Sequence, residues 1–467
     1  MTFVFNQDVI GSLLSLDLVL NEKKENASYN DALGAKKIEQ RNQNIDPPVT
    51  VAYAASFIFC TDPSSSGLVD ASLVLRHSIH KISSRNPESG SKYDYKMYAL
   101  VHRTRAIKCV DKIKELGFEV ILVDPPVDPE QIQDNAVRKR MPNTPCCAHH
   151  EFIKLHAYNL PEELFVHVDL DFSFHKPMDH LFDALLYDKD SPEGKAARDK
   201  LELQFPEEHV LPDRIDAFIT RDWAQVAPFK GWKSGFQAGF LVGRRDPSMV
   251  EDVSNIVLTH SFNENGYTNW DTSGWGGKGY GWFIVGEVGM QGAMAYFYDQ
   301  IRPNTTVELN LCRFNHLGAD STYTRGGPYY WSKHRNNLGK CRDERETCEQ
   351  CKFTAVEDIY SIHYSPCGKP WDCLTEGRDR PSKSVKKFIN IAMVDAEHCF
   401  ELQNQWHSLR ADLEKELFLK TGDGSLKRLS EGEFKTETFL GHCRNETDYI
   451  SLLDMSSELL EKTKELY

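Results

Sequence analysis

In the first part of the chain, continuous apolar runs alternate with segments in which apolar residues recur every three or four positions. Runs of β-branched, aromatic and other apolar residues are typical of buried strands and occur at 49–60, 93–101, 118–123 and 164–168. Between these runs, apolar residues three or four positions apart predict helices at 68–82, 104–116 and 151–160. This alternation predicts an α/β fold with a mostly parallel central sheet flanked by helices. Ligands of such sheets bind beyond the carboxyl ends of the strands.

Composition divides the chain into three parts. Residues 1–48 are polar, rich in Asn, Lys and Glu, and end in two prolines, which predicts a loosely ordered leader or stem. Residues 49–375 carry the strand and helix pattern and are expected to form the main domain. Helical spacing returns within 376–467, which predicts a helical C-terminal extension.

The overall composition is that of a folded protein with an acidic surface. Hydrophobic residues make up 40% of the 467 positions, enough for a sizeable core. The net charge of −14 argues against a partner that is a nucleic acid or an anionic membrane, because phosphate groups attract the opposite charge. No window approaches the ~20 apolar residues of a transmembrane segment. The apolar stretch 10–20 is interrupted by Asp17 and lacks the flanks of a signal peptide.

Cysteines and glycosylation motifs favour an oxidising compartment. The chain has 12 cysteines, and three Asn-x-Ser/Thr motifs begin at Asn26, Asn304 and Asn445. We therefore expect the secretory pathway, in particular the Golgi lumen. The cytoplasm is the alternative, because no secretion signal is visible.

Four cysteines are spaced almost as in a zinc ribbon, namely Cys348, Cys351, Cys367 and Cys373. The second pair, however, is separated by five intervening residues instead of two. In an oxidising compartment this spacing favours disulfides over zinc ligands.

Two acidic residues, Asp169 and Asp171, directly follow the buried run 164–168. At positions i and i+2 of an extended segment, their carboxylates lie on the same side. Two like charges at the exit of a buried strand are costly unless a cation neutralises them. Carboxylate oxygens suit hard divalent ions such as Mg²⁺ or Mn²⁺. A solvated turn is the alternative interpretation of this short motif.

A second motif gives the acidic pair a context. His363 stands six residues before Lys369, which opens the sequence Lys-Pro-Trp. This segment resembles the H-x-x-G-x-x-K-P-W signature of family 8 glycosyltransferases, the glycogenin and galactinol synthase type. The spacing from His to Lys is kept, whereas the glycine is displaced to Gly368.

Three further segments are similar to motifs of the same family. Lys154-Leu155-His156-Ala157-Tyr158 resembles its K-L-x-x-[WY] helix, and residues 235–242 resemble its F-N-[ST]-G-h-h-V stretch, with Gln237 in place of Asn. Gly289-Met290-Gln291-Gly292 stands where the family usually has G-D-Q-G. The resemblance covers about residues 49–371.

The resemblance implies a GT-A fold, with a nucleotide-binding half at 49–183 and an acceptor half at 215–375. It implies transfer of a hexose, with retention, from a nucleotide-diphosphate sugar to an acceptor hydroxyl. Uridine diphosphate is the family's usual nucleotide, and carbohydrates, glycoproteins and polyols are its acceptors. It further implies dependence on Mn²⁺ or Mg²⁺, and it leaves a homodimer open.

The same resemblance assigns roles to individual residues. Asp169, Asp171 and His363 would hold the metal, and the imidazole favours Mn²⁺. Lys154, Gly368 and Lys369 would contact the diphosphate. Gln237 and Gln291 would orient donor and acceptor. Because Met290 replaces the family's acidic residue, Asp222 or Glu287 would take its place.

Two other functions fit parts of the sequence. Asp169-Leu170-Asp171-Phe172-Ser173 partly fits the DxDx[TV] motif of haloacid dehalogenase-type phosphohydrolases, but that motif normally opens its fold, and three predicted strands precede this one. Met290 and the altered pair Gln237-Ala238 would suit a non-catalytic, carbohydrate-binding relative of the family.

A glycine- and aromatic-rich segment lies at 263–282. Its aromatic side chains, among them Trp275 and Tyr280, could stack on an acceptor sugar. A mobile surface loop is the alternative interpretation.

Overall fold

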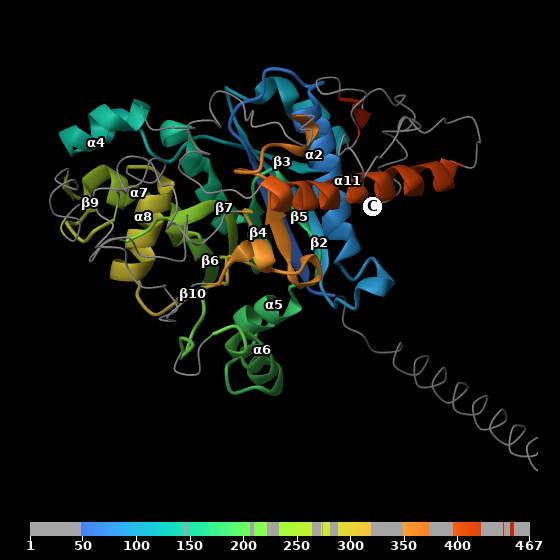
Figure 1. Ribbon diagram of the computed structural model, residues 1–467. Coiled ribbons are helices and arrows are strands. Elements are labelled where there is room, and N and C mark those ends of the chain that lie inside the picture. The colour runs from blue at the N-terminus through green and yellow to red at the C-terminus, as the bar shows by residue number, and fades with distance from the viewer. Residues whose placement is uncertain are drawn as a thin grey trace, which may run out of the picture. The chain divides into compact units, whose positions relative to one another are not determined.

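The structure is a computed structural model, shown in Figure 1. It describes residues 48–143, 147–205, 210–221, 233–263, 272, 274–280, 288–318, 349–372, 396–421, 442 and 449–452. All described helices and strands belong to one compact unit that begins at Thr50. No helix in these ranges is both long enough and apolar enough to cross a bilayer.

A seven-stranded sheet forms the centre of this unit, in the order β10-β6-β7-β4-β1-β2-β3. Its strands are β1 (Thr50–Phe57), β2 (Asp94–His102), β3 (Glu119–Val123), β4 (Leu164–Val168), β6 (Ala217–Arg221), β7 (Phe236–Arg244) and β10 (Thr306–Glu308). β7 pairs antiparallel with both β4 and β6, and the other pairings are parallel. The carboxyl ends of β1, β2 and β4 therefore share one edge of the sheet.

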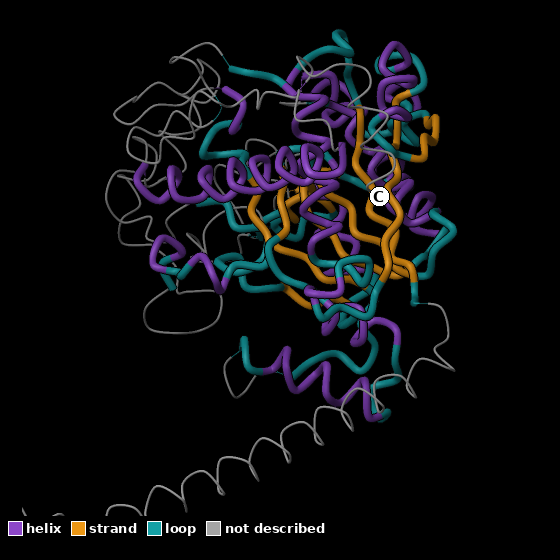
Figure 2. The backbone as a smooth tube through the Cα atoms, turned by 90° about the vertical axis from the view of Figure 1, so that its right-hand side faces the viewer, coloured by secondary structure: helices purple, strands orange, loops and turns teal. Residues whose placement is uncertain are grey.

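Helices pack against the sheet (Figures 1 and 2). The α-helices are α2 (Ser66–Lys81), α3 (Val110–Glu115), α4 (Asn135–Arg140), α5 (Asp179–Leu186), α6 (Pro192–Glu202), α7 (Ser248–Thr259), α8 (Met290–Tyr296) and α11 (Ala396–Thr421). The 3₁₀ helix η5 (Ala148–Asn159) replaces the helix predicted at 151–160. Shorter turns of helix are η1 (Pro87–Ser89), η2 (Ile107–Cys109), η3 (Pro129–Gln131), η4 (Met141–Asn143), η7 (Phe297–Ile301), η9 (Cys351–Phe353), η10 (Val356–Asp358) and η11 (Pro370–Asp372).

Alternate side chains of the central strands enter two separate cores. In β1, Val51, Tyr53 and Ala55 pack in a core with residues of α2 and α5. Ala52 and Ala54 point the other way, into a core with η5, α7 and α8. Burial on both faces explains why the strands read as nearly continuous apolar runs. The predicted α/β class, with a mostly parallel central sheet flanked by helices, is confirmed.

Two small antiparallel ladders stand beside the main sheet: β5 (Phe172–Phe174) with β11 (Ser361–His363), and β8 (Phe262–Asn263) with β9 (Gly274–Trp275). The β5–β11 ladder lies against α2 (Figure 1). α11 packs on α2 as well, and an apolar cluster that includes Val74, Ile362, Leu402 and Trp406 joins the three elements. Within the predicted C-terminal extension, α11 is thus part of the same compact unit as the sheet.

Disulfides link three pairs of the described cysteines: Cys60 with Cys109, Cys312 with Cys351, and Cys367 with Cys399. Cys351 and Cys367 therefore have different partners and are not ligands of one zinc ion. Cys348 and Cys373, the other two members of the ribbon-like spacing, lie outside the described residues.

Gly243 generates a prediction for the stability of the sheet. It pairs with Phe165 of β4, and a Cβ atom at position 243 would lie 2.9 Å from Cζ of that ring. Gly243→Ala should therefore lower the free energy of unfolding by about 1–3 kcal/mol, as overpacking does in other cores. Thermal or denaturant unfolding measures the effect.

The matched test introduces the same substitution into a Phe165→Leu background, in which the ring atoms are gone. There Gly243→Ala should cost clearly less, because the two sites are in contact and their effects are not additive. An equal cost in both backgrounds would show that the ring contact is not the reason for the glycine.

Candidate metal and phosphate site

Two segments that are far apart in sequence meet at the carboxyl end of β4. Asp169 directly follows β4, and Asp171 directly precedes β5. His363 ends β11 and pairs with Phe172, the residue after Asp171. One ligand atom from each of Asp169, Asp171 and His363 lies within 4.8 Å of the others. The structure thus brings together the three residues expected to hold a metal.

Lys154 lies beside Asp169. Its Nζ is 2.9 Å from Oδ1 of Asp169 and 3.5 Å from Oε1 of Glu151, and it donates to the carbonyl oxygen of Ala238 at 3.3 Å. The Lys154 side chain is only 7% exposed, so it is not a solvated surface lysine. Burial has the largest single effect and acts to raise the pKa of Asp169, but Lys154, His363 and His167 together outweigh it, and the pKa lies below its ordinary value.

Lys369 lies beside Asp171. Its ammonium group is ion-paired with Oδ2 of Asp171, and Nε2 of His363 is 3.4 Å from the same oxygen. Burial again acts to raise the pKa, yet Lys369 and His363 bring the pKa of Asp171 far below its usual range. Both carboxylates are therefore ionised at neutral pH, and each has its own ammonium partner.

The orientation of His363 is set by Asn315. Nδ1 of His363 lies 3.0 Å from Oδ1 of Asn315, whose Nδ2 donates to Oγ1 of Thr220 at 2.7 Å. Because an amide oxygen only accepts, Nδ1 carries the imidazole proton. Nε2 faces the carboxylates, 3.4 Å from Oδ2 of Asp171, and is the ring nitrogen that would bind a metal there. Neither Asn315 nor Thr220 was expected from the sequence.

Gly239 of β7 forms the floor of the site. Its carbonyl oxygen accepts from the Asp169 backbone N–H at 3.1 Å. A Cβ atom at position 239 would lie 2.5 Å from Cε1 of His363 and 2.9 Å from Oδ2 of Asp169. A larger residue would push these two side chains apart, so glycine permits the close approach of strand and site.

The two predicted glutamines lie on the adjoining wall. Oε1 of Gln237 accepts from the backbone N–H of Gly239 at 2.6 Å. Gln291 is buried, and its Oε1 has no hydrogen bond from any described residue. Both line one small cavity, together with His167 and Met290. Met290 is buried at the start of α8 and brings no charge to this wall.

The remaining predicted residues are placed as follows. Gly368 directly precedes Lys369 in the loop after β11. Asp222 and Glu287, the two candidates for an additional carboxylate, lie outside the described residues. Trp275 and Tyr280 are buried in the core around α8, so both interpretations, a mobile surface loop and stacking on a sugar, are wrong for these two residues.

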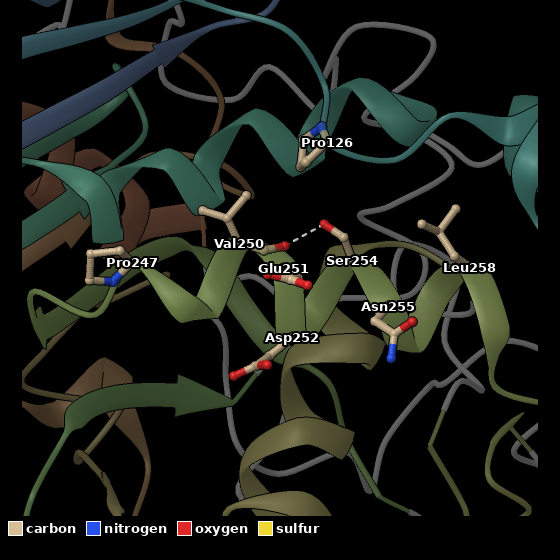
Figure 3. Close-up of a pocket in the computed structure, with 8 residues that line it drawn as sticks. All are labelled: Pro126, Pro247, Val250, Glu251, Asp252, Ser254, Asn255 and Leu258. Atoms are coloured by element: carbon tan, nitrogen blue, oxygen red, sulfur yellow. Dashed lines mark hydrogen bonds between the residues drawn. The ribbon is translucent and has the colours of Figure 1, made fainter.

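A separate groove of about 520 Å³ is lined by residues of α7, by Pro247 before it and by Pro126 of a neighbouring segment (Figure 3). Its polar lining comes from four residues of α7, namely Glu251, Asp252, Ser254 and Asn255, and Ser254 donates to the carbonyl oxygen of Val250 within the helix. None of the residues of the metal and phosphate site lines this groove.

No family model matches the chain, and no curated protein matches it. Solved structures do match. Mouse xyloside xylosyltransferase 1 has 12% identity over 68% of this chain and 98% of its own, with a TM-score of 0.36. The galactosyltransferase LgtC, solved with donor and acceptor sugar analogs, has 11% identity over 73% of this chain and 94% of its own, with a TM-score of 0.34.

The glycosyltransferase GlyE from Streptococcus pneumoniae TIGR4 is also similar, with 12% identity over 80% of this chain and 64% of its own, at a TM-score of 0.32. All three TM-scores lie below 0.5. The function proposed below therefore rests on the geometry of the site.

The floor of the site generates a prediction about metal binding. Gly239→Ala should weaken the binding of Mn²⁺ at least tenfold, because the new methyl group separates His363 from Asp169, and displaced ligands lose affinity on this scale. Titration calorimetry with MnCl₂ measures it.

Gly243→Ala is the matched control, since it is the same substitution in the same strand, next to Phe165 instead of the site. It should lower stability and leave the Mn²⁺ affinity unchanged. Equal Mn²⁺ affinities of all three proteins would contradict the assignment of the metal site.

Proposed function

We propose that this chain is a metal-dependent retaining glycosyltransferase of the GT-A, family 8 type. It would transfer a hexose from a nucleoside-diphosphate sugar, with uridine diphosphate as the nucleotide, to an acceptor hydroxyl. The observation that carries the proposal is the convergence of Asp169, Asp171, His363, Lys154 and Lys369 in one partly buried site. Two acids, one imidazole and two ammonium groups are the set that a cation and a diphosphate require together.

The ligand set fits a divalent cation. Asp169 and Asp171 are ionised, and Nε2 of His363 faces them, 3.4 Å from Oδ2 of Asp171. A mixed set of carboxylate oxygen and imidazole nitrogen suits Mn²⁺ better than Mg²⁺. When bound, the cation would offset the negative charge that grows on the leaving diphosphate.

The two lysines would bind the phosphate groups. In this structure Lys154 and Lys369 pair with Asp169 and Asp171 respectively. Once those carboxylates turn toward a cation, the ammonium groups gain a new anionic partner in the diphosphate. Such fixed charges stabilise a leaving group most where water is excluded, and Lys154 is almost completely buried.

The glutamines would orient the sugar. Gln291 has a buried Oε1 without a hydrogen bond from a described residue, which makes it an acceptor for a sugar hydroxyl. Gln237 binds the backbone of Gly239 through Oε1, which leaves its amide N–H groups to donate. In the front-face mechanism that the resemblance implies, a phosphate oxygen of the leaving group takes the acceptor's proton. No protein nucleophile is then required.

The acceptor would be a carbohydrate, a glycoprotein or a polyol, and the compartment would be the secretory lumen. Support for the compartment comes from three disulfides and from the exposed Asn304 of a glycosylation motif.

The proposal predicts Mn²⁺-dependent release of nucleoside diphosphate. A panel of UDP-, GDP- and ADP-sugars is screened for hydrolysis with Mn²⁺ and with EDTA, and the best donor is then used to screen acceptors. Asp171→Asn should lower turnover at least 100-fold, because it removes one of the ionised ligands.

Asp213→Asn is the control, because its side chain is 90% exposed. It should retain full activity. Turnover that survives both EDTA and Asp171→Asn would contradict the metal role. Phosphate release from p-nitrophenyl phosphate would support a phosphohydrolase instead, and donor binding without turnover would support a non-catalytic relative.

A further inference from the structure

We propose that helix α11 is a part of the donor site and that Gln403 is its positioning residue. Through the backbone carbonyl groups of Cys367 and Gly368, Gln403 holds the adjacent Lys369 where its ammonium group meets the diphosphate. This inference rests on the proposed function, and it gives the C-terminal extension a role in the reaction. The resemblance to family 8 ends near residue 371, so it does not cover α11.

The central contact is a pair of hydrogen bonds from one buried amide. Gln403 is 1% exposed. Its Nε2 donates to the carbonyl oxygen of Cys367 at 2.9 Å and to that of Gly368 at 3.2 Å. Both hydrogens of one NH₂ group are thus used on two consecutive carbonyl groups. Gly368 has a left-handed backbone (φ 84°), and Lys369 follows directly.

Other contacts of α11 hold the same loop on both sides of Lys369. Cys399 forms the disulfide with Cys367 before the lysine, and Trp406 packs against Trp371 after it, with ring centroids 5.8 Å apart. The loop from His363 to Trp371 is therefore fixed to α11 at its centre and at its end.

The position of the Lys369 ammonium group depends on the backbone more than the positions of the Lys154 and His363 side chains do. Its side chain is 35% exposed, whereas those of Lys154 and His363 are 7% and 2% exposed. A long side chain that packing does not confine loses conformational entropy when it binds a ligand. Fixing the backbone beneath it limits the volume that the ammonium group can sample.

The imidazole ligand of the metal is held by different contacts. His363 is fixed by the β11–β5 ladder and by Asn315, and neither contact involves α11. Loss of the Gln403 amide should therefore affect the affinity for a nucleoside diphosphate and leave the affinity for the metal alone unchanged. A residue with a merely structural role would weaken both.

The test uses the full chain and Gln403→Met, which keeps the length of the side chain and removes both donors. Calorimetry measures Mn²⁺ alone, and then UDP, GDP and ADP in the presence of Mn²⁺. For the nucleotide that the wild type binds, Gln403→Met should weaken affinity about five- to tenfold, the scale of one or two lost hydrogen bonds. Affinity for Mn²⁺ alone should stay within about twofold of the wild type.

A double-mutant cycle with Lys369→Met shows whether Gln403 acts through the lysine. In the Lys369→Met background, Gln403→Met should change nucleotide affinity less than about twofold, because the group that it positions is gone. Gln405→Met is the matched control, since it is the same substitution two residues away on a half-buried position of α11. It should bind nucleotide like the wild type.

Three results would overturn the inference: unchanged nucleotide affinity of Gln403→Met, an equal loss in the Lys369→Met background, or a parallel loss of Mn²⁺ affinity. If the wild type binds none of the three nucleotides, the proposed function fails and the inference fails with it. Should Gln403→Met not fold, as judged by thermal melting, Gln403→Asn replaces it. That variant keeps a polar group but is one methylene too short for the carbonyl groups, and the same results are expected.

Discussion

The site depends on the neutralisation of two neighbouring carboxylates. Burial acts to raise the pKa values of Asp169 and Asp171, yet both pKa values lie below the ordinary range. The compensating charges, Lys154 and Lys369, come from η5 and from the loop after β11. Because removal of one partner from a buried ion pair is strongly destabilising, these elements must all dock on the end of β4. The charge set therefore constrains the topology as well as the chemistry.

This constraint is also an argument for function. Buried ion pairs can often be replaced by apolar side chains of similar volume with no loss of stability, so stability alone does not account for two of them side by side. A cation and a diphosphate make use of both members of each pair. In the proposed function, their joint arrival would exchange carboxylate–ammonium contacts for carboxylate–metal and ammonium–phosphate contacts, and no charge of the set would be left without a partner. The exchange works only if the lysines stay in place, which makes the support of Lys369 by α11 part of the same arrangement.

The sequence predicted those parts of the molecule that local patterns determine. The apolar runs at 49–60 and 164–168 correspond to β1 and β4, since buried parallel strands need side chains that are apolar on both faces. It also predicted the residues that are recognised by their spacing within one segment, namely the acidic pair Asp169 and Asp171, and His363 with Lys369 six positions later. Their meeting in space needs the β5–β11 ladder, and neither three-residue strand has a pattern long enough to be recognised.

What the sequence could not predict depends on contacts between distant segments. Asn315 is a single polar residue in a loop, and only the fold shows that it orients His363. Gly239 looks like any glycine in a strand until His363 and Asp169 are seen to occupy the space of its missing Cβ. Trp275 shows the converse, because an aromatic residue among glycines suggests a surface loop, whereas its burial comes from the core around α8. For Asn315, Gly239 and Gln403 the deciding neighbour is more than thirty residues away, and a pattern within one segment carries no information about it.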